Sequence, residues 1–454
     1  MNEEKPNILF IVIDSLRSDR LAKNQKFAVI PNIEKLVEKG TNFTQVISTS
    51  DVTGTCLGSV FSGSYPFKTG ITQTNIDNSK MLFFKVLKKN GYKLSASIPK
   101  FTLIEKIIEN FDHKFIFDHT EWKEKETIFG KNGTKLLDFF EKISKDKPWF
   151  HYIHLVDIHG FGTLVKTPEK FDNKEYGKIK YDKILSAVDF WIKDLLEKIS
   201  VENTLIVITS DHGEYVADKG ENIESLSDLR DMPNFYRIMR KLKSKFPQLQ
   251  FLGDKLFVFI LTLHETIKIK SKKIEMEKDK QFIPRGFTKY LYDDVVKIPL
   301  LISGYQTPKK LIINKLTRQI DIFSTILGLI NIKNEEKIQG RNIFEVIKNN
   351  DEEIPAYIET GSSRLKKLGK SIGIRTSAYK YFRNRFNKKL DVYLFDIIND
   401  PQERDNIASK KPEIVKEYEK KLERILEDSV DSIKQDITDE EKQIEDELRK
   451  MGYL

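Results

Sequence analysis

The chain has 454 residues, a formal net charge of +9, 39% hydrophobic residues and 11% aromatic residues. This length exceeds what one core usually fills, so we expect a large domain and a smaller one, and the hydrophobic content excludes a disordered chain. The positive charge favours anionic substrates or surfaces, but the sequence has no zinc finger, helix-turn-helix or RNA-binding aromatic signature, and we expect no nucleic-acid partner.

The sequence also bears on the cellular compartment. A single cysteine, Cys56, excludes an intramolecular disulfide and fits a reducing compartment. The polar N-terminus, Met1–Lys5, lacks the basic start of a signal peptide. The longest later apolar run, Leu256–Leu263, is far shorter than the roughly 20 residues that cross a bilayer. We predict a cytoplasmic protein without a transmembrane segment, with peripheral membrane contact as an open alternative.

Two apolar runs end in polar residues with metal-binding potential. Residues 8–13 are followed by Asp14, and Leu205–Thr209 is followed by Ser210-Asp211-His212-Gly213-Glu214. Each run is typical of a strand buried on both faces, and parallel strands deliver their carboxyl ends to one edge of a sheet. Carboxylates with one imidazole suit a divalent ion such as Mg, Mn, Ca or Zn. The alternatives are that Asp14 caps a helix and that Asp-His-Gly is an ordinary turn.

The remaining patterns predict an α/β fold. Strand-like and helix-like segments alternate from residue 7 to about 330, which indicates a mostly parallel central sheet between helices. Further strands are expected at Lys93–Ile98, Phe150–His154 and Ile298–Ser303, and covering helices at Ile30–Lys39, Met81–Lys89, Gly133–Ser144 and Ile184–Ile199.

We expect a catalytic domain over residues 1–350 that carries a charged helical insertion at 219–285. The insertion contains a basic stretch, Arg237–Lys245. Such a helix can lie on a membrane or grip an acidic substrate. A solvated helical hairpin is the alternative.

A smaller C-terminal subdomain is expected over residues 351–454. Its strand candidates have the short spacing of a small antiparallel sheet, and a charged helical pattern begins at Pro412. Residues 361–390 carry ten Lys or Arg and no acidic residue. The strand candidates are Ala356–Glu359, Lys370–Arg375, Tyr379–Asn384 and Val392–Asp396.

Small and hydroxyl-bearing residues from Thr49 to Cys56 lead into a short apolar helix and then the turn Ser62-Gly63-Ser64-Tyr65-Pro66. A helix start stabilises an anion through its free N–H groups and its dipole. A hydroxyl at that start is well placed to attack an anionic ester.

These motifs and their order resemble the sulfatase family of the alkaline phosphatase superfamily, over nearly the whole chain apart from the insertion. The resemblance implies an alkaline phosphatase-like fold with a smaller C-terminal α+β subdomain. The matching pieces are Pro6-Asn7-Ile8, Asp14–Asp19, Ser62–Pro66 with Gly70, His154–His159, Thr209–Glu214, Leu291–Leu300, Asp321–Leu327, Gly373–Thr376, Tyr379–Tyr381, Leu394–Asp396, Asp400–Asn406 and Met451–Leu454.

The resemblance places Thr53 where the family carries its nucleophile. Sulfatases have there a Cys or Ser that is oxidised to formylglycine within a Cys/Ser-x-Pro-x-Arg motif. Here Thr53 is followed by Gly54-Thr55-Cys56-Leu57, so the Pro and the Arg are absent. A Thr nucleophile is what several phosphodiesterases and phosphotransferases of the superfamily use, including lipoteichoic acid synthases and phosphoethanolamine transferases.

The same resemblance implies that Asp14, Asp211 and His212 ligate one divalent metal, with Thr53 as the fourth group. The family's second Asp is replaced by Ser15. Because His212 replaces an amide, Mn, Zn or Mg is favoured over Ca. We expect no second metal, since its extra His ligands are not found.

Further residues are implied to contact the substrate. His159 matches a histidine that binds the substrate anion or protonates the leaving group, and a surface histidine is the alternative. His154 is a candidate substrate contact or a core residue. Lys100 resembles the lysine of the family's Gly-Lys-Trp-His segment, with Pro99 for Gly and Thr102 for His. Either Arg285 or Lys289 is expected to supply a cationic contact.

We therefore expect a metal-dependent hydrolase or transferase of phosphoric or sulfuric esters. Thr53 attacks in line and forms a covalent intermediate, and His159 assists the leaving group. The substrate is expected to be an anionic ester of a small molecule, a glycan or a lipid head group. One alternative is a sulfatase that carries formylglycine at Cys56. The other is a catalytically silent relative that binds an anion.

Overall fold

A mostly parallel sheet forms the centre of the computed structural model, which describes residues 5–22, 27–118, 127–145, 147–159, 166–214, 216, 290–361 and 370–427. These residues, apart from 216, belong to one unit composed of residues 1–215 and 285–454. The predicted insertion at 219–285 lies outside the described residues. In the part of the chain that is described, no helix is both long enough and apolar enough to span a membrane.

The main sheet has nine strands among the described residues, in the order β4-β3-β5-β1-β6-β7-β2-β8, with β9 also paired to β2. The neighbours from β4 to β6 are all parallel, and β7 is antiparallel to both of its neighbours. The strands are β1 (Asn7–Ile13), β2 (Gly40–Ile47), β3 (Lys93–Pro99), β4 (His113–Phe117), β5 (Trp149–Leu155), β6 (Thr204–Thr209), β7 (Lys297–Gly304), β8 (Leu311–Ile313) and β9 (Thr317–Arg318).

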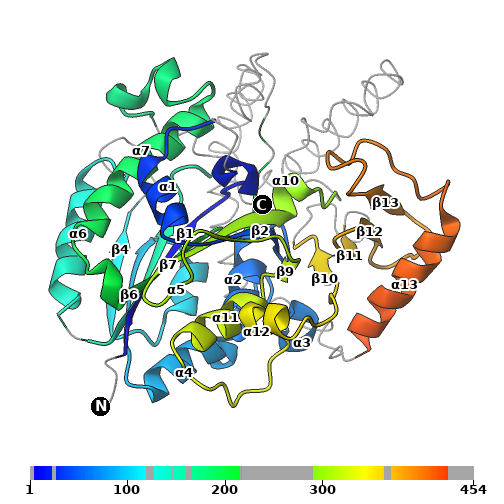
Figure 1. Cartoon of the computed structure of the whole chain (residues 1–454), viewed down its shortest axis with the longest axis horizontal. Helices are drawn as coiled ribbons and strands as arrows, with labels where there is room; N and C mark the ends of the chain where they lie inside the picture. The colour runs from blue at the N-terminus through cyan, green and yellow to red at the C-terminus, as the bar shows by residue number, and fades with distance from the viewer. Residues whose placement is uncertain are drawn as a thin grey trace, which may run out of the picture. The chain divides into compact units, whose positions relative to one another are not determined.

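Helices cover both faces of this sheet (Figure 1) because the central strands are apolar on both sides. In β1, Ile8 and Phe10 pack against α2, α4, α5 and α11, whereas Leu9 and Ile11 pack against α1, α6 and α7. The α-helices on these faces are α1 (Pro31–Glu38), α2 (Thr53–Ser62), α4 (Leu82–Lys89), α5 (Thr102–Ile107), α6 (Lys131–Ile143), α7 (Lys180–Leu196), α11 (Asp321–Leu329) and α12 (Ile343–Lys348). Two four-residue helices, α3 (Pro66–Thr69) and α10 (Asp293–Val296), pack with residues of the second sheet described below. Short 3₁₀ helices span Ser18–Leu21, Asn78–Lys80, Glu169–Phe171, Lys174–Tyr176 and Val201–Asn203.

A second, four-stranded antiparallel sheet follows in the order β10-β11-β12-β13, and α13 packs on it through Tyr418 and Leu422. Its elements are β10 (Ala356–Glu359), β11 (Ser371–Arg375), β12 (Tyr379–Asn384), β13 (Tyr393–Asp396) and α13 (Pro412–Leu426). The predicted α/β fold class, with its mostly parallel sheet and smaller C-terminal antiparallel sheet, is confirmed. The boundary between residues 350 and 351 stays a prediction.

The predicted helices and strands lie within a few residues of the observed ones, but β2, β4, β8 and β9 are absent from the sequence prediction. In β2 the polar residues Thr41 and Asn42 are buried, so the run lacks the apolar pattern that identified β1. The strands β8 and β9 have only three and two residues. Such short strands are defined by their pairing with β2 and not by their own sequence.

A buried ion cluster joins the second sheet to the main sheet. Lys380 of β12 is fully buried, and its Nζ lies 2.5 Å from Asp293 Oδ1, 2.7 Å from Glu403 Oε1 and 2.9 Å from the Leu291 carbonyl oxygen. Burial alone raises the pKa of Asp293, but Arg375 and Lys380 together hold that pKa well below its usual value. Both carboxylates therefore depend on Lys380 for their charge balance.

We predict that Lys380→Met lowers the free energy of unfolding by about 3–5 kcal/mol, because it leaves two buried carboxylates without their shared cation. Denaturant unfolding measures this loss. The matched control is Lys193→Met, which removes an exposed lysine that lies 3.2 Å from Glu197 on α7, and it should cost less than about 0.5 kcal/mol. Equal losses for the two variants would contradict the role of the cluster.

Candidate active site

The first carboxylate of the site stands where β1 ends, between two parallel neighbours. Asp14 is fully buried, and its backbone N–H donates to the Leu155 carbonyl oxygen of β5 at 2.8 Å. Ser15 adopts a left-handed backbone with φ +67°, which is uncommon outside glycine. Its backbone N–H donates to Asp211 Oδ1 at 3.2 Å, and its hydroxyl donates to Asp14 Oδ1 at 2.8 Å. The turn after β1 is therefore shaped around the two acids, and the 3₁₀ helix that follows has Arg17, not Asp14, as its N-cap.

The loop after β6 is fastened to the turn after β1. Ser210 Oγ lies 2.8 Å from the Ile13 carbonyl oxygen and 2.6 Å from that of His212, and it accepts the Leu16 N–H at 2.9 Å. A Cβ on Gly213 would lie 2.2 Å from the Asp294 carbonyl oxygen. The glycine of the Asp-His-Gly motif is thus required by the close approach of α10.

Thr53 is the first residue of α2, and Val52 is the N-cap residue without a side-chain capping bond. The Thr53 hydroxyl is therefore not used as a helix cap. It is fully buried and donates to Asp14 Oδ2 at 3.5 Å, while His212 Nε2 lies 3.3 Å away. The structure thus brings the hydroxyl to the residues that the sequence analysis groups around a metal.

Two further histidines face Asp14. His154 Nε2 lies 3.3 Å from Asp14 Oδ2, and its Nδ1 lies 2.7 Å from the Tyr152 hydroxyl. His159 Nε2 lies 3.8 Å from Asp14 Oδ1. Both imidazoles are buried, so neither is a plain surface histidine. The position of His154 beside Asp14 makes it a candidate ligand as well as a predicted substrate contact.

The histidines dominate the electrostatics of Asp14. Burial alone raises the pKa of its carboxyl, but the charge of His159 and the hydrogen bond from His154 hold the pKa well below its usual value. Asp157, between the two histidines in sequence, has no such partners, and burial raises its pKa to about 7. Of Asp14 and Asp157, Asp14 is therefore the one that the histidines keep ionised.

The donor set fits a divalent cation. Ligand atoms of Asp14, His154 and Asp211 all lie within 4.8 Å of one another. Asp211 Oδ2 is buried and accepts no hydrogen bond from the described residues, yet it faces His212 Nε2 at 3.2 Å. His212 Nδ1 lies 3.0 Å from the Gly213 carbonyl oxygen, and a carbonyl can only accept, so in the neutral ring Nε2 presents a lone pair. A carboxylate and an imidazole that both present lone pairs are the surroundings a metal ion requires.

The other predicted site residues have different surroundings. Lys100 is exposed and follows β3 at the same sheet edge, next to α5, which packs near the start of α2. Cys56 is buried one turn into α2, with Sγ 3.1 Å from the Ser50 carbonyl oxygen. Arg285 and Lys289 lie outside the described residues.

Sequence reasoning missed two buried glutamines. Gln319 Nε2 donates to the Asp211 carbonyl oxygen at 2.7 Å, and its Oε1 accepts the Thr49 N–H at 3.0 Å, so one amide bridges the two functional loops. Gln73 Oε1 accepts the Gly54 N–H at 2.6 Å. Gln319 lies just before the matched run Asp321–Leu327, and that neighbourhood was the one available signal.

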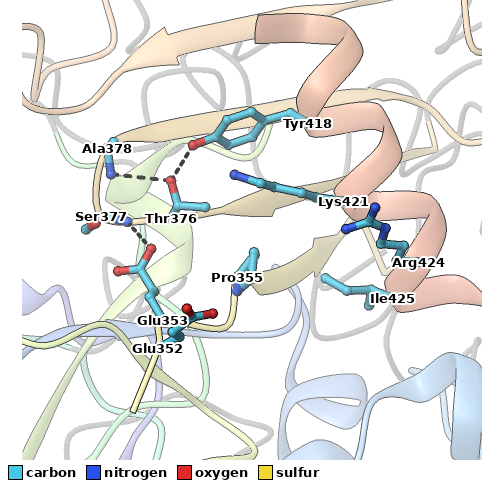
Figure 2. Close-up of a pocket in the computed structure, with 10 residues that line it drawn as sticks. All are labelled: Glu352, Glu353, Pro355, Thr376, Ser377, Ala378, Tyr418, Lys421, Arg424 and Ile425. Carbon is cyan, nitrogen blue, oxygen red and sulfur yellow. Dashed lines mark hydrogen bonds between the residues drawn. The ribbon is translucent and has the colours of Figure 1, made fainter. Parts of the chain in front are cut away.

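A cavity of about 520 Å³ lies elsewhere, between α13 and the segment before β10 (Figure 2). The cavity lies at one end of β10, where Pro355 lines it. Glu359, at the opposite end of β10, pairs with Ser50, which lies near Thr53 in the sequence. Two glutamates, Glu352 and Glu353, offset the charges of Lys421 and Arg424 in its lining. This cavity is therefore not the ester site.

The fold is an α/β fold, and its candidate active site lies at the carboxyl edge of the sheet. Residues 6–332 match the family model described as Sulfatase, so the chain belongs to the sulfatase family, and residues 286–429 match the model described as N-sulphoglucosamine sulphohydrolase, C-terminal. The predicted family and the predicted enzyme class, an ester hydrolase of this superfamily, are confirmed.

Similar proteins cover the chain to different extents. An uncharacterized protein of Haemophilus influenzae is 28% identical over 214 residues, and the match spans 46% of this chain but only 32% of that protein. The ulvan-active sulfatase of Formosa agariphila is 22% identical over 95% of this chain and 83% of that enzyme. A solved structure in complex with its substrate, D-glucosamine-2-N,6-O-disulfate, covers 95% of this chain and 100% of its own with a TM-score of 0.62 and 15% identity, which shows a shared fold.

We predict that Mg, Mn, Zn or Ca chloride raises the melting temperature of the chain, because a ligand bound only by the folded state stabilises it. Asp211→Asn should weaken the affinity for the best of these ions on the order of 10- to 100-fold, the loss seen when partners of a metal site are removed. Titration calorimetry and thermal melting measure both effects.

The control for this prediction is Asp194→Asn, which makes the same change on the exposed face of α7 and should keep the wild-type affinity. His154→Gln and His212→Gln, compared side by side, identify which imidazole holds the ion. An Asp211→Asn chain that binds the ion as tightly as the wild type would refute the assignment.

Proposed function

We propose that the chain cleaves sulfuric esters of anionic carbohydrates by direct attack of the Thr53 hydroxyl, without formylglycine. The observation that carries this proposal is the buried Thr53 Oγ1, 3.5 Å from Asp14 Oδ2 and 3.3 Å from His212 Nε2. The ulvan-active sulfatase and the complex with a disulfated glucosamine support a sulfated carbohydrate as the substrate class.

The residues around Thr53 suit a nucleophilic displacement. Asp14 Oδ2 and His212 Nε2 are the two acceptors that face the hydroxyl, so its proton has a place to go as Thr53 Oγ1 bonds to the sulfur. As that bond forms, the bond between sulfur and the sugar oxygen breaks. An N–H of His159 gives the departing oxygen its proton. Attack of water on the sulfur then releases sulfate and restores the Thr53 hydroxyl.

One divalent ion, held by Asp14 and Asp211 together with His154 or His212, would supply positive charge for the ester oxygens and lower the pKa of a nearby hydroxyl. The geometry of these ligand atoms supports that role. Burial of the whole set keeps bulk water out, which strengthens the interaction of the site with an anion.

Phosphoric esters are a second candidate, favoured by the identity of the nucleophile. This chain departs from the Cys/Ser-x-Pro-x-Arg pattern at Thr53–Leu57, and a threonine nucleophile is what several phosphodiesterases and phosphotransferases of the superfamily use. Transfer to an acceptor hydroxyl in place of water belongs to the same candidate. A panel of sulfate esters, phosphate monoesters and phosphate diesters separates the two.

Cys56 is a poor candidate for formylglycine. Its side chain packs against the Ser50 carbonyl oxygen inside the first turns of α2, and Leu57, which follows it, is buried in the core. A formylglycine at position 56 would lie one helical turn beyond Thr53, the first residue of α2.

We predict that Thr53→Ala lowers kcat by at least about 10³-fold with little change in melting temperature, because it removes the attacking atom. Thr53→Ser keeps a hydroxyl and should retain most of the activity. Steady-state kinetics on the ester panel measures both, and mass spectrometry of rapidly quenched enzyme should find the transferred group on the peptide that contains Thr53.

The matched control is Cys56→Ala, which should leave kcat within about threefold of the wild type, since the thiol takes no part in the displacement. Intact-mass measurement should find an unmodified chain. A fully active Thr53→Ala variant, or formylglycine at Cys56 together with an inactive Cys56→Ala variant, would overturn the proposal.

A further inference from the structure

We infer that Gln73 is a further catalytic residue, which donates a hydrogen bond from its amide Nε2 to an oxygen of the ester anion attacked at Thr53. The inference rests on the proposed function of Thr53, and it names the group that contacts the anion at the start of α2. Nothing in the motifs of the sequence identifies Gln73.

The orientation of the Gln73 amide is fixed by its one partner. The side chain is 1% exposed, and its Oε1 accepts the Gly54 N–H at 2.6 Å. A backbone N–H can only donate, so the atom that faces Gly54 must be the oxygen. The nitrogen of the amide is bonded to the same carbon, and it therefore also lies at the first turn of α2, beside the residue that follows Thr53.

The Gln73 nitrogen is left without a partner. Nε2 is buried and makes no hydrogen bond among the described residues. Most buried polar groups in folded proteins are paired, and an unpaired one costs about 1–3 kcal/mol. One oxygen of a bound anion would accept from an N–H of Gln73, and another would accept from the free N–H groups at the start of α2.

Close packing holds the amide in place. A Cβ built on Gly54 would lie 2.9 Å from Gln73 Oε1, 3.1 Å from Gln73 Cα and 2.6 Å from Leu103 Cδ1. The glutamine therefore lies directly against the backbone of α2, and Leu103 of α5 contacts the same point. A donor held in this way needs no reorganisation when charge develops on the substrate.

The chemistry of α2 explains why such a donor is needed. The helix has ten residues and carries no Lys, Arg or His. At the position where the family motif has its arginine this chain has Leu57, which is buried in the core. The free N–H groups of the first turn carry partial positive charge, and the neutral Gln73 amide adds a directed donor beside them.

The test is Gln73→Glu, assayed from neutral to alkaline pH at a temperature at which the variant is folded, because burial raises the pKa of the introduced carboxyl and favours its ionisation only at the alkaline end. This variant keeps an oxygen for the Gly54 N–H but replaces the free donor with a negative atom. Because the new carboxyl is buried without a cation, we expect a lower melting temperature, and in the folded variant a kcat/KM reduced about 10²- to 10³-fold, the usual effect of removing one oxyanion donor. Gln73→Met removes both the acceptor and the donor, and it should lower the melting temperature as well as the activity.

The matched control is Asn75→Asp, an equivalent amide-to-carboxylate change two residues along the chain. Asn75 Nδ2 donates to the Gly70 carbonyl oxygen, away from α2, so this variant should keep near wild-type kcat/KM. If Gln73 only braced the helix, Gln73→Glu would be as active as the control, and the inference would fail.

Binding of inorganic sulfate and phosphate, measured by calorimetry in the Thr53→Ala background, separates this inference from the proposed function. Adding Gln73→Glu should weaken the binding of these ions at least tenfold, whereas adding Asn75→Asp should not. Unchanged binding would overturn the role of Gln73 even if Thr53 is the nucleophile. If the Thr53→Ala chain were active and adding Gln73→Glu still abolished anion binding, Thr53 would not be the nucleophile. The role of Gln73 as an anion contact would then stand.

Discussion

The parallel pairing of β1 with β5 on one side and β6 on the other is the constraint on which the site depends. The register aligns Val12 with His154 and with Thr209, so Asp14, His154 and Asp211 reach one edge of the sheet although they are far apart in sequence. Hydrogen bonds then join the turn after β1 to the loop after β6, as between the Ser15 N–H and Asp211 Oδ1 and between Ser210 Oγ and the Ile13 carbonyl oxygen. A shift of one residue in either pairing would turn alternate side chains to the opposite face and separate the two acids.

Much of this framework could be predicted from the sequence, because the central strands have a distinctive apolar pattern. Uninterrupted apolar runs predict strands buried on both faces, and β1 and β6 are such strands. The edge of the sheet could not be predicted in the same way. The pairing of β2 with β7, β8 and β9 is determined by long-range contacts, and buried polar residues such as Thr41 and Asn42 hide it.

The proximity of Asp14 and Asp211 could be predicted from the sequence because each follows a buried apolar strand, whereas the positions of the histidines could not. His151 and His154 lie three residues apart on β5, so their side chains face opposite sides of the sheet. His151 lies in the core with its ring nitrogens 2.8 Å and 3.1 Å from the Ser95 and Ser97 hydroxyls, and burial lowers its pKa to about 3. Gln73 and Gln319 act through their amides on backbone atoms of distant loops, and no motif or periodicity marks such a residue.

The segment before Thr53 shows why the second sheet belongs to the site. The Thr49 carbonyl oxygen accepts the Glu359 N–H at 2.8 Å, and Asp51 Oδ1 accepts the Gly361 N–H at 2.8 Å, so β10 holds this segment from one side. Gln319 holds it from the main sheet, and Cys56 Sγ contacts the Ser50 carbonyl oxygen from α2 itself. The start of α2 presents both Thr53 and the Gly54 N–H that orients Gln73. The position of this helix start therefore depends on the contacts from β10, from Gln319 and from Cys56. The C-terminal sheet therefore fixes the backbone from which Thr53, the proposed nucleophile, projects.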